Sequence, residues 1–302
     1  MAELRFDNRV AVVTGAGRGL GREYALLLAS RGAKVVVNDL ARESADNRPV
    51  AQQVADEIRA AGGEAVASVE SVADPVSAAR IIDTALERFG RIDCVVNNAG
   101  IVRDRYFFNM SVEEWKAVID VHLNGTFYVS RAAAQQFKKQ ESGCYINMTS
   151  TSGLIGNPGQ ANYNAAKMGI VGLSKTIALD MAKFKVRSNC IAPWAWTGMT
   201  ASIPTETPEG LARVEKFKKM RPELIAPLAV YLASDSAAAV TGQIFGVRAN
   251  EIYLFNQIRV IRSTHRGEGW TPETIAAHAI PALESHFADN RPSPTFTSWD
   301  PI

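Results

Sequence analysis

The sequence has few cysteines and few histidines, the side chains that build disulfide frameworks and most metal sites. There are three cysteines and four histidines among 302 residues. An odd number of cysteines, each in an apolar and strand-like run, predicts buried free thiols rather than a disulfide framework. The histidines show no metal-ligand spacing with the cysteines, so we expect no catalytic metal. These residues are Cys94, Cys144, Cys190, His122, His265, His278 and His286.

Long apolar runs and an excess of charge of one sign are also missing. No apolar run reaches the roughly 18 residues that a membrane span needs, and the first ten residues lack the apolar core of a signal peptide. The 33 basic and 31 acidic residues leave a net charge of +2, and no basic stripe carries interleaved aromatic residues. We therefore expect a cytoplasmic protein that binds neither membranes nor nucleic acids. Its length suits one large domain.

A glycine-rich segment, TGAGRGLG, lies between an apolar run and a helical run near the start of the chain. This pattern predicts the strand, turn and helix that open a dinucleotide-binding fold. Gly15 would permit the tight turn, Gly19 would let the backbone approach a pyrophosphate, and Gly21 would let the helix pack closely on the strand. Leu20 belongs to the same predicted cofactor site.

The choice between NAD and NADP depends on two residues of opposite charge. Asp39 ends the next apolar run, where a carboxylate would bind a ribose hydroxyl and favour NAD. Arg18, inside the glycine turn, could instead attract the extra phosphate of NADP. We give Asp39 more weight because it would contact the ribose directly, so NADP is the less expected cofactor. Leu40 follows Asp39, and Ser71 with Val72 ends the third predicted strand, where an adenine ring would lie, although a loop at a strand end needs no ligand.

Apolar runs of strand length alternate with helical patterns through most of the chain. This alternation predicts an α/β fold, a doubly wound parallel Rossmann sheet with helices on both faces. We expect a single domain over residues 1–302, with a core over 1–250, a substrate lid over 197–222 and an extension over 251–302. The lid segment is equally compatible with a surface helical hairpin. We expect strands at 9–13, 33–37, 64–69, 91–96, 144–148 and 186–192, with a further strand pair over 251–262 and a loop directly after the strand at 144–148. We expect helices at 50–61, 74–89, 112–139, 161–182 and 271–286.

Small residues follow the strand at 91–96. They are Asn98, Ala99 and Gly100, and their size would let the backbone approach a cofactor. Ligands bind at the carboxyl ends of the strands in such a sheet. The glycine turn, Asp39 and Asn98 all follow predicted strands, so they are expected at one edge of the sheet.

The segment STSGLIGNPGQANYNAAK, residues 150–167, adds a serine, a tyrosine and a lysine at that edge. Tyr163 and Lys167 would lie one helical turn apart on the same face. A tyrosine has an ordinary pKa of about 10, and each unit of lowering requires about 1.4 kcal/mol. The Lys167 ammonium would favour the phenolate, so Tyr163 could exchange a proton with an alcohol while Ser150 holds the substrate oxygen. Taken alone, this spacing also fits two surface neighbours.

The set TGAGRGLG, NNAG, Ser150, Tyr163 and Lys167 resembles the short-chain dehydrogenase/reductase family over residues 7–250. The resemblance implies a nicotinamide cofactor and hydride transfer between an alcohol and a ketone. It implies that Tyr163 is the acid/base, that Lys167 binds the nicotinamide ribose, and that Pro193 and Thr197 lie along the nicotinamide. It also implies a homodimer or homotetramer.

Longer stretches, RIDCVVNNAGIVRDRYF among them, resemble the (3R)-hydroxyacyl-CoA dehydrogenase units of peroxisomal multifunctional enzymes, the type 4 17β-hydroxysteroid dehydrogenase branch. This implies a 3-hydroxyacyl-CoA or steroid-derived CoA thioester as substrate. Arg103 and Arg105 would attract the CoA phosphates, with a pair of solvated charges at the cleft rim as the alternative. We expect an NAD-dependent oxidoreductase that interconverts a secondary alcohol and a ketone. The alternatives are an NADPH-dependent 3-oxoacyl-[acyl-carrier-protein] reductase and a catalytically silent nucleotide-binding or regulatory protein.

The chain departs from the family pattern at three places. His122 stands where the family usually has an asparagine that supports the catalytic lysine through water. An imidazole can bridge a water and a backbone carbonyl, so we expect His122 in a proton relay, with a packed core histidine as the alternative. Trp194 and Trp196 are bulky replacements for small residues. The extension ends in a tail with Phe296 and Trp299, which we expect to pack on a neighbouring subunit or else at the substrate mouth.

Overall fold

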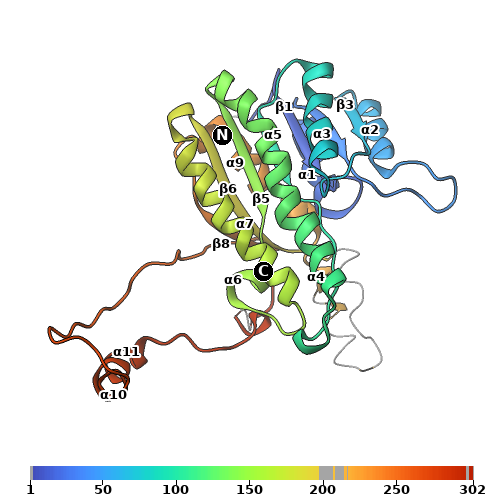
Figure 1. Cartoon of the computed structure of the whole chain (residues 1–302). Coiled ribbons are helices and arrows are strands. Elements are labelled where there is room, and N and C mark those ends of the chain that lie inside the picture. Colours follow the sequence, from blue (N-terminus) through green and yellow to red (C-terminus); the bar gives the residue numbers. More distant parts are fainter. Residues whose placement is uncertain (1–2, 197–206, 208–213, 216, 297–298, 302) are drawn as a thin grey trace.

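The structure is a computed structural model that describes residues 3–196, 207, 214–215, 217–296 and 299–301. Its centre is a sheet with helices on both faces (Figure 1). Within the described residues the sheet has eight strands in the order β3-β2-β1-β4-β5-β6-β7-β8. All neighbours are parallel except β7 and β8. The strands are β1 (Val10–Thr14), β2 (Lys34–Asn38), β3 (Glu64–Ser68), β4 (Cys94–Asn97), β5 (Gly143–Met148), β6 (Val186–Trp194), β7 (Ile244–Arg248) and β8 (Glu251–Leu254).

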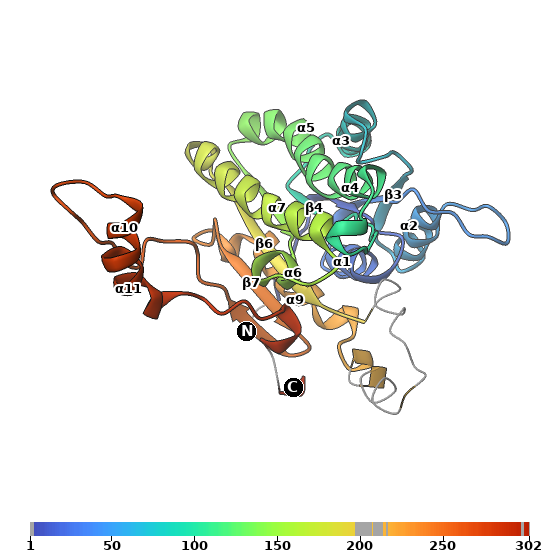
Figure 2. The same ribbon diagram turned by 60° about the horizontal axis from the view of Figure 1, so that its bottom comes forward.

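The central strands are continuous buried runs because helices cover both faces of the sheet. Every residue of β1, β4 and β5 is buried. On one face Val13 and Val35 pack with side chains of α1, α2 and α9, and on the other Val12 and Val95 pack with α3 and α5. Figure 2 shows α3, α5 and α7 side by side along one face. The helices are α1 (Gly19–Ser30), α2 (Val50–Ala60), α3 (Pro75–Phe89), α4 (Val112–Ile119), α5 (Gly125–Gln140), α6 (Thr151–Ile155), α7 (Ala161–Asp180) and α9 (Ala226–Ala233).

The predicted fold class and the buried free cysteines are confirmed, and three details of the prediction are wrong. The helix expected over 112–139 contains a π-helical turn, Asp120–Asn124, between α4 and α5. The segment after β5, expected to be a loop, forms the short helix α6, because Ser150 caps it by accepting a hydrogen bond from the Ser152 N–H. The strand pair expected over 251–262 is the single strand β8, after which the chain leaves the sheet.

The extension forms an arm that projects from the body of the protein (Figure 1). Its outer part is helical through α10 (Pro272–Thr274), a π turn (Ile275–Ala279) and α11 (Ile280–Leu283), as predicted. The Thr271 hydroxyl accepts from the Thr274 N–H and begins this helix. Within the described part of the chain, no helix is both long and apolar enough to cross a membrane.

The tail returns from the arm to the same subunit. The Ser293 N–H donates to the Gly156 carbonyl at 2.8 Å, directly after α6. Trp299 packs on Tyr253 of β8, and its indole Nε1–H donates to Glu251 at 2.6 Å. The tail therefore contacts its own β8 and the end of α6, beside the segment that carries Ser150.

Candidate active site

The predicted site residues converge at the carboxyl edge of the sheet. The glycine turn follows β1, Asp39 follows β2, Asn98 follows β4 and Ser150 follows β5. These four strands run parallel, so their carboxyl ends share one edge. Pro193 lies near the end of β6 at the same edge.

The glycine turn is shaped by close backbone approaches. Gly15 has φ +60°, and a Cβ there would lie 2.7 Å from the Ala99 Cα. A Cβ on Gly21 would lie 2.1 Å from the Gly15 carbonyl oxygen, so a side chain at that position would push α1 away from β1. Gly19 also has a positive φ of 54° and begins α1. The amino terminus of this helix therefore faces the turn, which fits a bound pyrophosphate.

Thr14 and Asn98 join the glycine turn to the turn after β4, and no sequence pattern indicated this role of Thr14. The Thr14 hydroxyl accepts hydrogen bonds from the Asn98 and Ala99 N–H groups at 3.0 and 3.1 Å. The Asn98 amide nitrogen in turn donates to the Thr14 and Gly15 carbonyls at 3.1 and 3.0 Å. Asn98 thus fixes the glycine turn against the end of β4, and its side-chain nitrogen is already used for that purpose.

Asp39 faces the glycine turn. One carboxylate oxygen accepts from the Gly17 N–H and the other from the Ala41 N–H, each at 2.9 Å. A Cβ on Gly17 would lie 2.9 Å from that first oxygen, so the turn passes close over the carboxylate. Arg18 points to an acidic partner, donating to Glu43 at 2.9 Å. Its charge is therefore balanced within the protein.

Lys167 and Tyr163 lie on one face of α7, as predicted from their spacing. Lys167 is buried, and its Nζ donates to the Met148 carbonyl of β5 at 2.7 Å. The same nitrogen lies 5.4 Å from the centroid of the Tyr163 ring. The Thr149 hydroxyl donates to the Lys167 carbonyl at 2.8 Å, which ties α7 to the end of β5. Ser150 follows immediately, and its hydroxyl interacts with the Tyr163 side chain.

Burial opposes the charged forms of both residues. It raises the pKa of Tyr163 to about 12, while the hydrogen bond with Ser150 acts in the opposite sense. It lowers the pKa of Lys167 to about 7. The pKa of Tyr163 is thus raised in this structure, whereas its spacing from Lys167 predicted that the ammonium would lower it. The two charged forms stabilise each other only when they are present together, since opposite charges attract strongly at a poorly solvated site.

His122 lies in the π-helical turn and packs edge-on against Tyr163, with 5.1 Å between ring centroids. Its Nε2 lies 2.8 Å from the Ile101 carbonyl and 3.0 Å from the Ile101 N–H. Its Nδ1 is buried without a hydrogen-bond partner. Burial and the nearby Lys167 lower the pKa of His122 to about 3, so its imidazole is neutral at physiological pH. The short Gly100 is required here, because a Cβ would lie 2.3 Å from the imidazole.

Asn162 is a second residue that the sequence analysis missed. It is fully buried, and its amide nitrogen donates to the Arg103 and Glu114 carbonyls at 3.0 and 3.1 Å. Its oxygen accepts from the Tyr163 N–H at 2.7 Å. Asn162 therefore connects the start of the tyrosine helix to the loop after β4.

The other predicted residues follow β2 and β3 or lie outside the described structure. Leu40 is 58% exposed, and Val72 packs in the core beneath Gly125. Ser71 is half-buried, and its hydroxyl accepts from the Ala73 N–H. Thr197 and most of the predicted lid over 197–222 lie outside the described residues. Trp194 packs on Tyr253 with 5.8 Å between ring centroids, so it contacts the extension.

No group of three or more histidine, cysteine, aspartate or glutamate side chains is placed to hold a metal ion among the residues that the structure describes. The residues present fit a dinucleotide instead. The glycine turn brings the amino terminus of α1 to the carboxyl edge of the sheet, where it can face a phosphate, and the Lys167 ammonium lies at the same edge.

Comparisons with known proteins agree with this geometry. The family model described as enoyl-(acyl carrier protein) reductase matches residues 15–249. The chain is 51% identical over 237 residues to peroxisomal multifunctional enzyme type 2 of Drosophila melanogaster, covering 78% of this chain and 38% of that protein. It is 40% identical over 306 residues to hydroxyacyl-CoA dehydrogenase ChsB1 of Mycobacterium tuberculosis, covering 97% of this chain and 93% of that one.

A solved structure is also similar over nearly the full length. The crystal structure of a short chain dehydrogenase from Mycobacterium avium superposes with a TM-score of 0.82 at 40% identity, covering 94% of this chain and 97% of that chain. The multifunctional relative from Drosophila is much longer, and this chain spans 38% of its length.

Proposed function

The chain belongs to the short-chain dehydrogenase/reductase family, whose members are NAD(P)-dependent oxidoreductases acting on CH–OH groups, and we propose that this member is an NAD-dependent 3-hydroxyacyl-CoA dehydrogenase. The observation that carries the proposal is the meeting of Ser150, Tyr163 and Lys167 beside the glycine turn at one edge of the sheet. The substrate is a small molecule. The thioester class is supported by the names of the relatives, ChsB1 and the multifunctional enzyme among them.

Tyr163 is the proposed acid/base. In the oxidation direction the Tyr163 oxygen takes the proton of the substrate hydroxyl, while Ser150 donates a hydrogen bond to the same substrate oxygen. A bound nicotinamide supplies the hydride acceptor. Because burial raises the pKa of Tyr163 to about 12, the phenolate requires a counter-charge, and the Lys167 ammonium 5.4 Å from the ring centroid provides it. Reduction follows the same path in reverse.

NAD is the proposed cofactor rather than NADP. Asp39 lies over the glycine turn, where its carboxylate would accept from ribose hydroxyls and repel a phosphate. Arg18, the cation that could bind that phosphate, is paired with Glu43. Both features favour the cofactor without the extra phosphate.

His122 is proposed to position the proton relay that serves Lys167. Its Nε2 is occupied by the Ile101 backbone, while its buried Nδ1 remains an acceptor without a partner. A water held there would be a donor to Nδ1 and a bridge toward the lysine. The imidazole itself stays neutral because its pKa is lowered to about 3.

Arg103 is the proposed contact for the phosphates of a CoA carrier. Asn162 holds its backbone beside the tyrosine helix, while its guanidinium is exposed and donates only to the adjacent Val102 carbonyl among the contacts of the described residues. Arg105 is less available because it pairs with Glu114 at 3.2 Å. An Arg103→Ala variant is therefore expected to raise KM for a CoA thioester and to leave kcat nearly unchanged, whereas Arg105→Ala is the weaker matched variant.

We also propose that the arm packs on a second copy of this chain. The apolar side chains Ile258, Val260 and Ile261 are 78%, 87% and 71% exposed in the single subunit. Exposed apolar residues of this density indicate a surface that a partner covers. Replacing all three with serine is expected to shift the protein toward monomer in multi-angle light scattering. An unchanged mass would contradict the arm contact. Phe287→Ser, at another position of the arm, is the comparison variant.

Several relatives are named as peroxisomal, whereas the sequence alone predicted a cytoplasmic location, so that location stays a prediction.

The function is tested with a panel of 3-hydroxyacyl-CoA and steroid-derived CoA thioesters, each assayed with NAD and with NADP. The proposal expects NAD-dependent oxidation of at least one CoA ester. Preference for NADPH and for carrier-protein thioesters would favour the 3-oxoacyl-[acyl-carrier-protein] reductase alternative. NAD binding without turnover on any alcohol would favour the silent nucleotide-binding protein.

A further inference from the structure

The helix α6 connects Ser150 to the tail, and it is too short to hold its own position. It spans the five residues Thr151–Ile155, and an isolated helix of this length is not stable in water. Its place therefore depends on contacts with the rest of the chain. One contact is with α7, where a Cβ on Gly153 would lie 2.7 Å from the Lys167 Cβ. Another is with a small core cluster, against which Leu154 packs.

Ser150 is bound to α6 through both of its oxygen atoms. Its hydroxyl accepts a hydrogen bond from the Ser152 N–H at 3.1 Å. Its carbonyl accepts from the Gly153 and Leu154 N–H groups, each at 3.0 Å. A shift of α6 would therefore move the Ser150 hydroxyl, the group that binds the substrate oxygen in the proposed reaction.

The tail contacts α6 at its other end. Ser293 is buried, and its N–H donates to the Gly156 carbonyl at 2.8 Å, one residue beyond the helix. Phe296 of the tail stacks on Phe255, with 6.0 Å between ring centroids. Phe255 packs against the same core cluster as Leu154. The tail therefore reaches α6 through a direct hydrogen bond and through an aromatic contact.

The end of the tail is fixed to the sheet. The buried Arg248 guanidinium donates to the Glu251 carboxylate at 3.4 Å and to the Trp299 carbonyl. The Trp299 indole donates to the other Glu251 carboxylate oxygen at 2.6 Å. Arg248 ends β7 and Glu251 begins β8. A tail anchored there resists displacement, so it can hold α6 in place.

We propose that the tail positions Ser150 for the reaction by holding α6 at its carboxyl end. Ser293 and Phe296 are then positioning residues, which act on the substrate only through α6 and Ser150. This inference rests on the proposed dehydrogenase function, in which the Ser150 hydroxyl donates to the substrate oxygen.

The first test removes the Ser293 N–H. Ser293→Pro deletes this donor, and a proline fits because Ser293 begins a 3₁₀ turn and Pro292 before it has an extended ψ of 153°. Ser293→Ala is the matched control, because it keeps the N–H. We expect Ser293→Pro to lower kcat about two- to tenfold, the worth of one hydrogen bond, with unchanged NAD affinity. Ser293→Ala should match wild type, and an unchanged kcat in Ser293→Pro would overturn the proposal.

A double-variant cycle shows whether this loss passes through Ser150. Ser150→Ala removes the hydroxyl that α6 orients, so Ser293→Pro should cause no further loss of kcat in that background. Two losses that multiply would show that the tail acts elsewhere, and they would overturn the proposal. Phe296→Ala should behave as Ser293→Pro does, whereas Phe296→Tyr, which keeps the stacked ring, should retain wild-type turnover.

Hydrogen exchange of the α6 N–H groups tests the contact independently of turnover. We expect these groups to exchange about two- to tenfold faster in Ser293→Pro and in Phe296→Ala than in wild type, because the helix has lost a fixed end. Unchanged exchange in either variant would overturn the proposal. A wild type without turnover on any thioester would instead refute the dehydrogenase function, and the exchange would still decide whether the tail holds α6.

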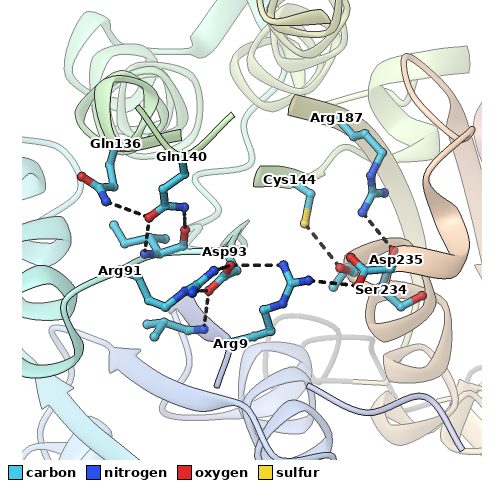
Figure 3. A network of polar contacts seen from close by, with 12 residues as sticks. Arg9, Arg91, Asp93, Gln136, Gln140, Cys144, Arg187, Ser234 and Asp235 are labelled. Atoms are coloured by element: carbon cyan, nitrogen blue, oxygen red, sulfur yellow. Dashed lines mark hydrogen bonds and ion pairs between the residues drawn. The ribbon is translucent and has the colours of Figure 1, made fainter. Parts of the chain in front are cut away.

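A variant at the opposite edge of the sheet controls for a general loss of stability. Gln140 donates to the Ile92 carbonyl at 2.6 Å and accepts from the Ile92 N–H at 3.3 Å, in a polar network at the amino ends of the strands (Figure 3). Gln140→Ala should lower the free energy of unfolding without changing exchange in α6. Equal acceleration of α6 exchange in Gln140→Ala and Ser293→Pro would show a general effect on stability and would overturn the proposal.

Discussion

Replacing Thr14 with valine tests how the two turns at the cofactor edge are held together. The Thr14 side chain is 1% exposed, and its hydroxyl accepts from two N–H groups, those of Asn98 and Ala99. Valine has nearly the same shape but no acceptor, so both N–H groups lose their partner. An unsatisfied buried donor costs about 1–3 kcal/mol. Since these donors are only part-buried, we expect Thr14→Val to lower the free energy of unfolding by about 2–4 kcal/mol.

Urea denaturation followed by circular dichroism measures this change, and Thr14→Ser is the matched control. Serine keeps the hydroxyl and loses one methyl group, which costs about 1 kcal/mol. We also expect Thr14→Val to weaken NAD binding, because the glycine turn and the end of β4 are no longer joined by the hydroxyl. If Thr14→Val were no less stable than Thr14→Ser, the two hydrogen bonds would not hold the turns and the reasoning would be refuted.

Three further changes test other parts of the site. In the folded chain His122 has a pKa of about 3, whereas in the unfolded chain its pKa is the ordinary value of about 6.5. As the pH falls below 6.5, only the unfolded chain binds a proton at His122, so the free energy of unfolding falls by about 1.5 kcal/mol between pH 6.5 and 5. Urea titrations at each pH should show that His122→Asn removes this loss of unfolding free energy. If His122 serves the relay, the variant should also change the pH profile of turnover, and an unchanged profile would contradict the relay. Glu43→Gln should free Arg18 from its ion pair, and an exposed ion pair is worth about 0.2–1 kcal/mol. We therefore expect fluorescence titrations to show an NADP affinity raised about two- to fivefold and an unchanged NAD affinity. Equal NADP affinity in the variant and the wild type would argue against a blocked phosphate site. Gly100→Ala should displace the imidazole, cost about 1–3 kcal/mol of stability and reduce turnover, and a variant as stable and active as wild type would show that the contact is slack.

The sequence was sufficient to predict the strands β1 to β6 and to place the proposed catalytic residues at the carboxyl edge of the sheet. The strands are apolar on both faces because helices cover both sides, so each stands out as a short buried run, as Val10–Thr14 does. The glycine turn was recognisable because only residues without a Cβ fit where Gly15 and Gly21 lie. The i, i+4 spacing of Tyr163 and Lys167 placed them on one helix face.

The missed features depend on contacts between distant segments. Thr14 acts through Asn98, 84 residues further along the chain, and Asn162 acts through Arg103, 59 residues before it. Neither residue type carries a local pattern that indicates such a partner. The raised pKa of Tyr163 depends on how completely the surrounding chain excludes water, which spacing alone does not give.

Local patterns also misled at two places. The π turn at His122 keeps the apolar spacing of an α-helix, so the sequence predicted one regular helix there. The alternation after Glu251 resembled a strand pair, but among the described residues only Glu251–Leu254 forms a strand there. Val260 lies beyond this strand and is 87% exposed. In both cases the spacing of apolar residues did not determine the backbone conformation, because contacts with the rest of the fold decide it.

The most direct test of the catalytic centre compares wild type with Tyr163→Phe, using the best 3-hydroxyacyl-CoA substrate and measuring NADH formation by stopped flow beside NAD binding by fluorescence. Loss of the phenol oxygen removes the proton acceptor, whose contribution is typically about 10²–10⁴-fold. The ring and its packing against His122 and Lys167 remain. We predict a loss of turnover of at least about 100-fold with unchanged NAD affinity. Turnover close to that of wild type would contradict the assignment of Tyr163 as the acid/base.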